Sequence, residues 1–128
     1  MYEGGLAERY VQALTKEIAR WSEVKSPVAV DTIYFGGGTP SLLTPPQIER
    51  ILRAVTDRFD VLNGGEITIE LNPGDGGTST TSKHGTLREF RRLGINRASF
   101  GAQTFDDREL KQLGRRHTAA DIPATELF

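Results

Sequence analysis

The stretch that decides the fold class is residues 28–38, which read VAVDTIYFGGG. It combines β-branched and aromatic residues with three successive glycines. This composition predicts a buried strand that runs directly into a glycine loop.

Helices are predicted on both sides of this strand. Upstream, one apolar stripe predicts an amphipathic helix over about 6–24; its members are Leu6, Tyr10, Leu14, Ile18 and Trp21. Downstream, Thr44 caps a second helix and Gln47 returns the capping hydrogen bond. We expect Phe59 to be the last apolar position of this helix, before the stop signal Asn63-Gly64-Gly65.

Two further strands and two short helices complete the pattern. Alternating apolar and polar residues predict strands at 66–71 and 97–103, and periodicity predicts helices at 86–93 and 106–113. Residues 74–85 contain no apolar side chain, so we expect a mobile insertion there.

Helices and strands therefore alternate along the chain, which is the signature of the α/β class with parallel strands. About three βα units fit into 128 residues, and we expect them to form one domain over 1–128. Parallel sheets are normally covered inside a doubly wound fold or a barrel. A three-stranded sheet with two open edges therefore predicts part of a larger barrel, with marginal stability on its own.

Composition excludes several classes of function. The formal net charge is −1, which disfavours a nucleic-acid partner. The chain has no cysteine, so it supplies no disulfide, thiolate nucleophile or iron–sulfur ligand. Its apolar runs are too short for a signal peptide or a membrane span, and we expect a cytoplasmic protein. With two histidines and no ligand pattern around them, no metal site is predicted.

Candidate binding residues lie where the predicted strands end, because ligands of parallel α/β folds gather at the carboxyl ends of strands. Glu70 and Gln103 point to one face of the sheet by alternation and together suit a small molecule with hydroxyl or amide groups. The alternative for each is a solvated polar side chain. Arg115 and its neighbours Arg116 and His117 either reach an anionic ligand or form a solvated helical face.

The glycine loop Gly36-Gly37-Gly38-Thr39 matches neither the dinucleotide fingerprint nor the P-loop spacing. Glycines let a ligand approach bare backbone, and they also permit simple chain reversal. Both interpretations remain open from the local sequence.

Four strings, taken in order, resemble the oxygen-independent coproporphyrinogen III oxidase and haem chaperone family of radical S-adenosylmethionine (SAM) proteins. They are DTIYFGGGTPSLL (31–43), EITIELNPG (66–74), GINRASFGAQTFDD (94–107) and LGRRHT (113–118). The resemblance covers about 10–121 and implies a partial (β/α) barrel of the radical SAM type, with SAM and a [4Fe–4S] cluster at the strand exits.

The resemblance also implies site residues. Gly37, Gly38 and Thr39 would lie along the methionyl group of SAM, and Glu70 would hydrogen-bond to the same cofactor. Gln103 and Arg115 fall where the oxidases contact a second SAM molecule.

The chain departs from this family in one respect that bears on chemistry. The family holds its cluster on a CxxxCxxC loop, and no such loop is present. We therefore expect a fragment without its C-terminal barrel units, inactive alone, from a parent that oxidises coproporphyrinogen or carries haem. Between the two branches, the string LGRRHT (113–118) is slightly more similar to the chaperone branch. The alternatives are a cluster-free module that binds SAM or another small molecule, and a product without function.

Overall fold

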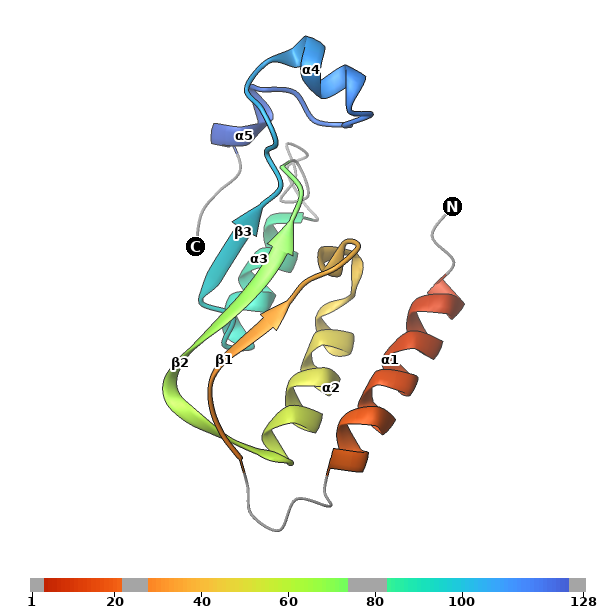
Figure 1. Cartoon of the computed structure of the whole chain (residues 1–128), viewed down its shortest axis with the longest axis vertical. Helices are drawn as coiled ribbons and strands as arrows, with labels where there is room; N and C mark the ends of the chain where they lie inside the picture. Colours follow the sequence, from red (N-terminus) through yellow and green to blue (C-terminus); the bar gives the residue numbers. More distant parts are fainter. Residues whose placement is uncertain (1–3, 22–27, 74–82, 125–128) are drawn as a thin grey trace. The chain divides into compact units, whose positions relative to one another are not determined.

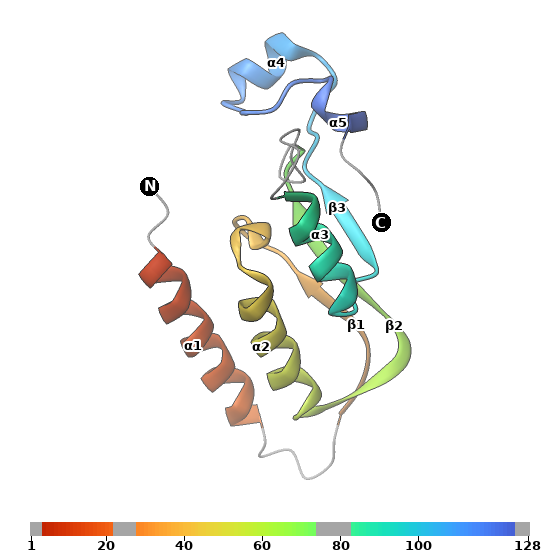
Figure 2. The same cartoon turned by 180° about the vertical axis from the view of Figure 1, so that it is seen from behind.

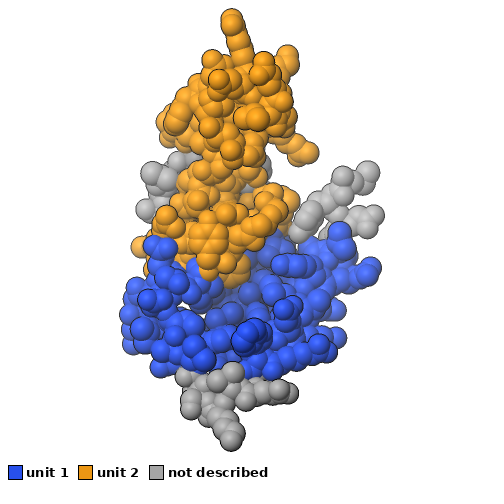
Figure 3. Space-filling model, viewed as in Figure 1, with its two compact units in different colours: residues 1–33, 43–66 blue, residues 34–42, 67–128 orange. Residues whose placement is uncertain are grey.

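The computed structural model describes residues 4–21, 28–73 and 83–124, and these fall into two compact units. The first unit comprises residues 1–33 and 43–66, and the second comprises residues 34–42 and 67–128 (Figure 3). Helices and strands alternate as predicted (Figure 1). The elements are α1 (Gly4–Arg20), β1 (Val28–Phe35), η2 (Pro40–Leu42), α2 (Pro45–Thr56), β2 (Phe59–Leu71), α3 (Lys83–Arg92), β3 (Arg97–Phe100), α4 (Asp107–Gln112) and α5 (Asp121–Ala124).

In the first unit, α1 and α2 pack side by side (Figures 1 and 2). Val11 of α1 and Ile48 of α2 are fully buried. The predicted start of α2 is confirmed, because the Thr44 amide donates to Gln47 Oε1 at 3.0 Å. Glu8 of α1 accepts from Arg50 of α2 at 2.6 Å, and this ion pair ties the two helices together at their surface.

The predicted stripe of α1 is only partly confirmed, because Leu14 and Ile18 are half-buried and the other three members are exposed. Leu6, Tyr10 and Trp21 are each about 60% exposed, whereas Ala7 and Val11 are buried. The face that α1 presents to α2 is therefore offset by one residue from the predicted stripe. Small and β-branched side chains let the two helices approach closely, so packing selected that face over the larger apolar residues beside it.

The predicted end of α2 is also wrong. The helix ends at Thr56 with Asp57 as its C-cap, and Phe59 already belongs to β2. The Asn63-Gly64-Gly65 segment lies inside this 13-residue strand, where Gly64 adopts a φ of 79°. A glycine with positive φ inside a strand marks a local irregularity such as a bulge, so the same residues serve the strand instead of stopping a helix.

The strands form one open sheet of three parallel strands in the order β1-β2-β3. β2 and β3 are in register from Thr68 opposite Arg97 to Leu71 opposite Phe100. Their covering helix in the second unit is α3, which lies along one face of this strand pair (Figures 1 and 2). The α/β prediction with about three parallel strands is thus confirmed.

The second unit has its own apolar core. Its fully or nearly fully buried residues come from β2, α3, α4 and the α3–β3 connection: Ile69, Leu71, Leu87, Phe90, Ile95 and Leu110. The mobile insertion predicted over 74–85 is too long, because α3 begins at Lys83; residues 74–82 lie outside the described part. The prediction relied on the absence of apolar residues, and this helix begins with residues that are not apolar.

The third strand is shorter than predicted. β3 ends at Phe100, although the Gly101 amide still donates to the Leu71 carbonyl at 2.9 Å. Beyond this bond the chain turns tightly, because the Ala102 amide donates to the Phe100 carbonyl. Strand alternation therefore no longer decides where the Gln103 side chain points.

No helix in the described ranges is both long enough and apolar enough to cross a membrane.

Candidate functional site

The site is built around Glu70, a half-buried residue at the penultimate position of β2. Its two carboxylate oxygens have different partners. Tyr34 Oη donates to Oε1 at 2.8 Å, and the Gly37 amide donates to Oε2 at 3.0 Å. A carboxylate can accept about four hydrogen bonds, so these two contacts fix its orientation and leave acceptor capacity for a ligand.

The glycines in the loop that follows β1 are required for different reasons: steric space at Gly36, and backbone conformation at Gly37 and Gly38. A Cβ atom on Gly36 would lie 2.7 Å from Tyr34 Cε1 and 3.4 Å from Glu70 Cδ, so only glycine fits beside the Tyr34 ring. Gly37 and Gly38 adopt φ values of 79° and 58°, which favour glycine whatever the space around them. Among the residues that the structure describes, and apart from each glycine's chain neighbours, no atom lies within 4 Å of a Cβ placed on either residue, so a ligand can approach their backbone.

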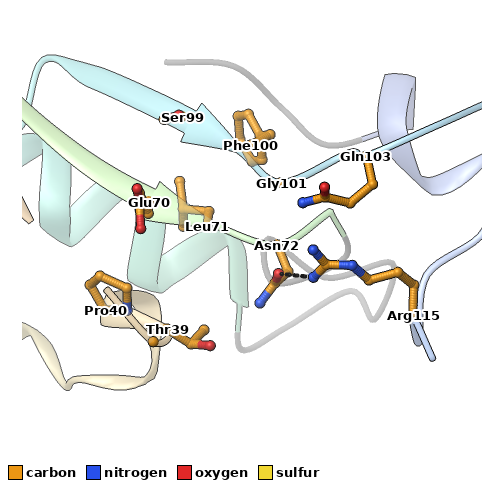
Figure 4. Close-up of a pocket in the computed structure, with 11 residues that line it drawn as sticks. Thr39, Pro40, Glu70, Leu71, Asn72, Ser99, Phe100, Gly101, Gln103 and Arg115 are labelled. Atoms are coloured by element: carbon orange, nitrogen blue, oxygen red, sulfur yellow. Dashed lines mark hydrogen bonds between the residues drawn. The ribbon is translucent and has the colours of Figure 1, made fainter. Parts of the chain in front are cut away.

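Two cavities adjoin this loop in the second unit. The first has a volume of about 220 Å³ (Figure 4); it is lined by Gly38, Thr39, Pro40, Glu70, Leu71, Asn72, Ser99, Phe100, Gly101, Gln103 and Arg115. The second, of about 320 Å³, shares Thr39, Asn72 and Arg115 with the first. Ligand pockets for small molecules commonly measure roughly 300–1,000 Å³, so the two together suit a small organic molecule.

The first cavity is lined by side chains of both charges, and the second is lined by arginines. Glu70 is the carboxylate that lines the first cavity, while Arg115 lines both cavities and Arg116 lines the second. The Arg115 guanidinium donates to Asn72 Oδ1 at 3.3 Å, and Figure 4 shows it extended toward Asn72. A carboxylate on one side and guanidinium groups on the other complement a zwitterion or a molecule that carries both an ammonium and a carboxylate.

All six predicted binding residues lie in this region of the second unit. Five of them line the first cavity: Gly38, Thr39, Glu70, Gln103 and Arg115. Gly37 joins them through its amide bond to Glu70. Their placement together is an observation about the fold, and their role toward SAM stays a prediction.

Sequence reasoning missed two residues that shape the site, Tyr34 and Asn72. Tyr34 lies two positions before Gly36, and Asn72 lies two positions after Glu70. Because side chains two positions apart in a strand share a face, alternation could have found both residues. His117 is buried and places Nε2 3.3 Å from the Ala102 carbonyl oxygen. Sequence reasoning named His117 only with Arg115 and Arg116, as part of a group that either reaches an anionic ligand or forms a solvated face; the burial of His117 rules out the solvated alternative for this side chain.

Metal binding finds no support in the described part of the chain, where no group of three or more His, Asp or Glu side chains is arranged to hold an ion. The sequence contains no cysteine, so this chain offers no thiolate to an iron–sulfur cluster. The residues present therefore do not fit such a cluster, whereas the glycine loop and the clamped carboxylate do fit a small polar ligand.

Comparison with known proteins gives a consistent family. A haem chaperone HemW from Synechocystis is 40% identical over 118 residues, which is 92% of this chain and 27% of that protein. HemW from Escherichia coli is 38% identical over 108 residues, 84% of this chain and 27% of that protein. The chain thus spans about a quarter of the length of the curated relatives it matches.

A solved structure agrees with these relatives. Escherichia coli coproporphyrinogen III oxidase (HemN), described as a radical SAM enzyme, matches with a TM-score of 0.81 and 27% identity. The match covers 98% of this chain and 27% of that protein. Residues 4–125 also match the family described as the radical SAM superfamily. These matches, over a partial barrel sheet with a glycine loop at its strand exits, show that the chain belongs to the radical SAM superfamily.

Proposed function

We propose that the strand exits of the second unit bind SAM. In this proposal Glu70 accepts from the ammonium of the methionyl group, and Gly37, Gly38 and Thr39 line its length. The resemblance assigns Gln103 and Arg115 to a second SAM molecule; because they line the same cavity as Glu70, we propose that they contact SAM there from the side of the β3 exit. The observation that carries the proposal is the Glu70 carboxylate, held at 2.8 Å by Tyr34 and at 3.0 Å by Gly37 on the wall of a cavity.

The chemistry of the lining supports this ligand class. An amino-acid head group needs an acceptor for its ammonium and donors for its carboxylate, and the cavity offers Glu70 for the first and Arg115 for the second. In radical SAM proteins the bound cofactor, reductively cleaved, supplies a radical that abstracts hydrogen. This chain holds no cluster ligand, so its own part is to bind and orient SAM.

We further propose that the protein serves haem or porphyrin metabolism. The support is the match to HemW and HemN, together with a second cavity that combines Arg115 and Arg116 with apolar Leu42 and Pro73. Guanidinium groups beside an apolar wall suit a flat molecule with carboxylate substituents. Haem is flat and carries carboxylates, whereas coproporphyrinogen carries carboxylates on a ring that its methylene bridges keep from being planar. Both offer carboxylates to the guanidinium groups, and titration of the intact parent with haem separates a chaperone from an oxidase.

Equilibrium binding of SAM to the full chain tests the first proposal. We expect micromolar binding, weakened about 10-fold to 100-fold by Glu70→Gln, because hydrogen bonds to charged groups contribute about 1.5–3 kcal/mol. Glu17→Gln is the matched control, since Glu17 is an exposed carboxylate on α1 and its change removes the same charge. Absence of binding at millimolar SAM contradicts the proposal.

A cluster-free binding module is the second candidate, favoured by the absence of cysteine. It predicts that SAM binds without cleavage. Incubation of the chain with iron, sulfide, dithionite and SAM then yields no 5′-deoxyadenosine above a protein-free blank. Formation of that product at catalytic levels would contradict this candidate.

A further inference from the structure

We propose that His117 is a positioning residue that holds Gln103 in the conformation in which it faces the ligand cavity. The inference rests on the proposed function only in that Gln103 is taken to face a ligand. Its structural basis is a hydrogen bond from the His117 ring to the turn that carries Gln103.

The turn at Gln103 is strained. Gln103 has a φ of 66°, and it is the one residue other than glycine with positive φ among those the structure describes. The Thr104 amide donates to the Ala102 carbonyl at 2.8 Å across it. This is a γ-turn with positive φ at its centre, a rare and strained form. Such a conformation persists at a glutamine only where neighbouring groups hold it.

His117 contacts this turn at the Ala102 carbonyl, which is the acceptor of the turn's own hydrogen bond. Its Nε2 lies 3.3 Å from the Ala102 carbonyl oxygen, the same oxygen that closes the γ-turn. A carbonyl only accepts hydrogen bonds, so Nε2 carries the proton and donates. Ala102 O then uses both of its lone pairs, one for Thr104 and one for His117.

The His117 ring is itself well anchored. It is 7% exposed, and the backbone on either side is fixed by hydrogen bonds. The Arg115 amide donates to the Leu110 carbonyl at 2.9 Å, and the Thr118 amide donates to Asp121 Oδ2 at 2.7 Å. The imidazole therefore acts as a fixed donor against which the turn is held.

The turn decides where the Gln103 amide lies. A Cβ on Gly101 would lie 3.4 Å from Gln103 Nε2 and 3.6 Å from Asn72 Oδ1, so the amide folds back over the strand exit beside Asn72. Figure 4 shows the side chain on the wall of the first cavity. If Gln103 relaxed to negative φ, its side chain would leave that wall.

Nuclear magnetic resonance on the ligand-free full chain tests the conformational claim without any cofactor. We expect imidazole nitrogen shifts that show a protonated Nε2, and a strong intraresidue amide–Hα cross-peak at Gln103, as positive φ produces. The variant His117→Leu should lose that cross-peak, whereas His117→Gln should keep it, because the Gln amide nitrogen reaches the place of Nε2. Retention of positive φ at Gln103 in His117→Leu would overturn the proposal.

SAM affinity tests the functional consequence. We expect His117→Leu to weaken binding about tenfold and His117→Gln to remain within about threefold of the unmodified chain, as loss of one hydrogen bond predicts. In a Gln103→Gly background, His117→Leu should change affinity less than twofold, because the side chain that it positions is gone. An equal loss in both backgrounds assigns His117 a purely structural role and overturns the inference.

Two provisions keep the outcome decisive. If His117→Leu does not fold, His117→Asn replaces it, since its amide nitrogen occupies the place of Nδ1 and does not reach Ala102. If the unmodified chain binds no SAM, the proposed function fails, while the resonance experiment still decides whether His117 holds the turn.

Discussion

The Gly37 amide donates to Glu70 Oε2 at 3.0 Å, so the loop after β1 and the end of β2 are joined through one carboxylate. The side chain proposed to bind the ligand is therefore also the one that fixes the loop around it. Any change that moves Glu70 should alter the loop and the ligand affinity together.

Loss of the Tyr34 hydroxyl should lower affinity without unfolding the chain. Tyr34 is 55% exposed, and its Oη donates to Glu70 Oε1 at 2.8 Å. We expect Tyr34→Phe to weaken SAM binding by about tenfold, since the carboxylate loses one of its two fixed donors. Tyr10→Phe, which removes an exposed hydroxyl from α1, is the control. Equal affinity in all three proteins would show that the clamp does not matter for binding.

Gly36 should tolerate no side chain. A Cβ there would lie 2.7 Å from the Tyr34 ring, so Gly36→Ala must displace the ring or the Glu70 carboxylate. Because the Tyr34 ring is half exposed and can shift, we expect a small loss of stability, and weaker SAM binding because the ring would move away from Glu70. Gly5→Ala on α1 meets no atom of a described residue within 4 Å, its chain neighbours aside, and should leave binding unchanged. Chemical denaturation and SAM titration of both variants measure the two effects.

The N-cap of α4 should contribute to stability near the site. Asp106 accepts from the Arg108 amide at 2.7 Å and from the Glu109 amide at 3.3 Å. We expect Asp106→Ala to lower the free energy of unfolding by about 1 kcal/mol, and Asp106→Asn to retain most of it. Urea denaturation followed by circular dichroism gives the comparison. Equal stability of the Ala and Asn variants would contradict a capping role.

Glu8 should make the stability of the first unit depend on pH. The hydrogen bond from Arg50, followed by those from Gln47 and Gln12, holds the pKa of Glu8 below its ordinary value of 4.5. A lowered pKa in the folded chain gives stability that is present above pH 4.5 and is lost as the pH falls through the folded pKa. Glu8→Gln should therefore be less stable than the unmodified chain at pH 7 and equally stable at low pH. A stability difference that does not change with pH would contradict this assignment.

The sequence predicted those features that depend on local chemistry. The β-branched run before three glycines identified β1 and its loop, although the predicted burial of this strand is wrong, since Phe35 alone of its residues is buried. The Thr44–Gln47 pattern identified the start of α2. Glu70 lies at a strand exit beside a cavity, as its position in the alternating pattern predicted. The family resemblance, carried by four strings in order, is confirmed by the superfamily match.

Features that depend on tertiary packing were not predictable in this way. Periodicity gave one apolar stripe on α1, and the contact with α2 buries Val11, which lies outside that stripe. Glycine pairs stop helices and also occur inside strands, so Gly64 could not decide the end of α2 alone. Alternation fails at Gln103, because its backbone turns instead of extending.

The positive φ values of Gly37 and Gly38 have a stereochemical consequence. An L-residue is strained at these angles, whereas a D-residue adopts them readily, since it mirrors the allowed region. Semisynthetic chains with L-Ala or D-Ala at position 38 would therefore separate two reasons for the glycine. If D-Ala restores stability yet still blocks SAM, the missing side chain leaves room for the ligand; if it restores both, handedness alone explains the glycine.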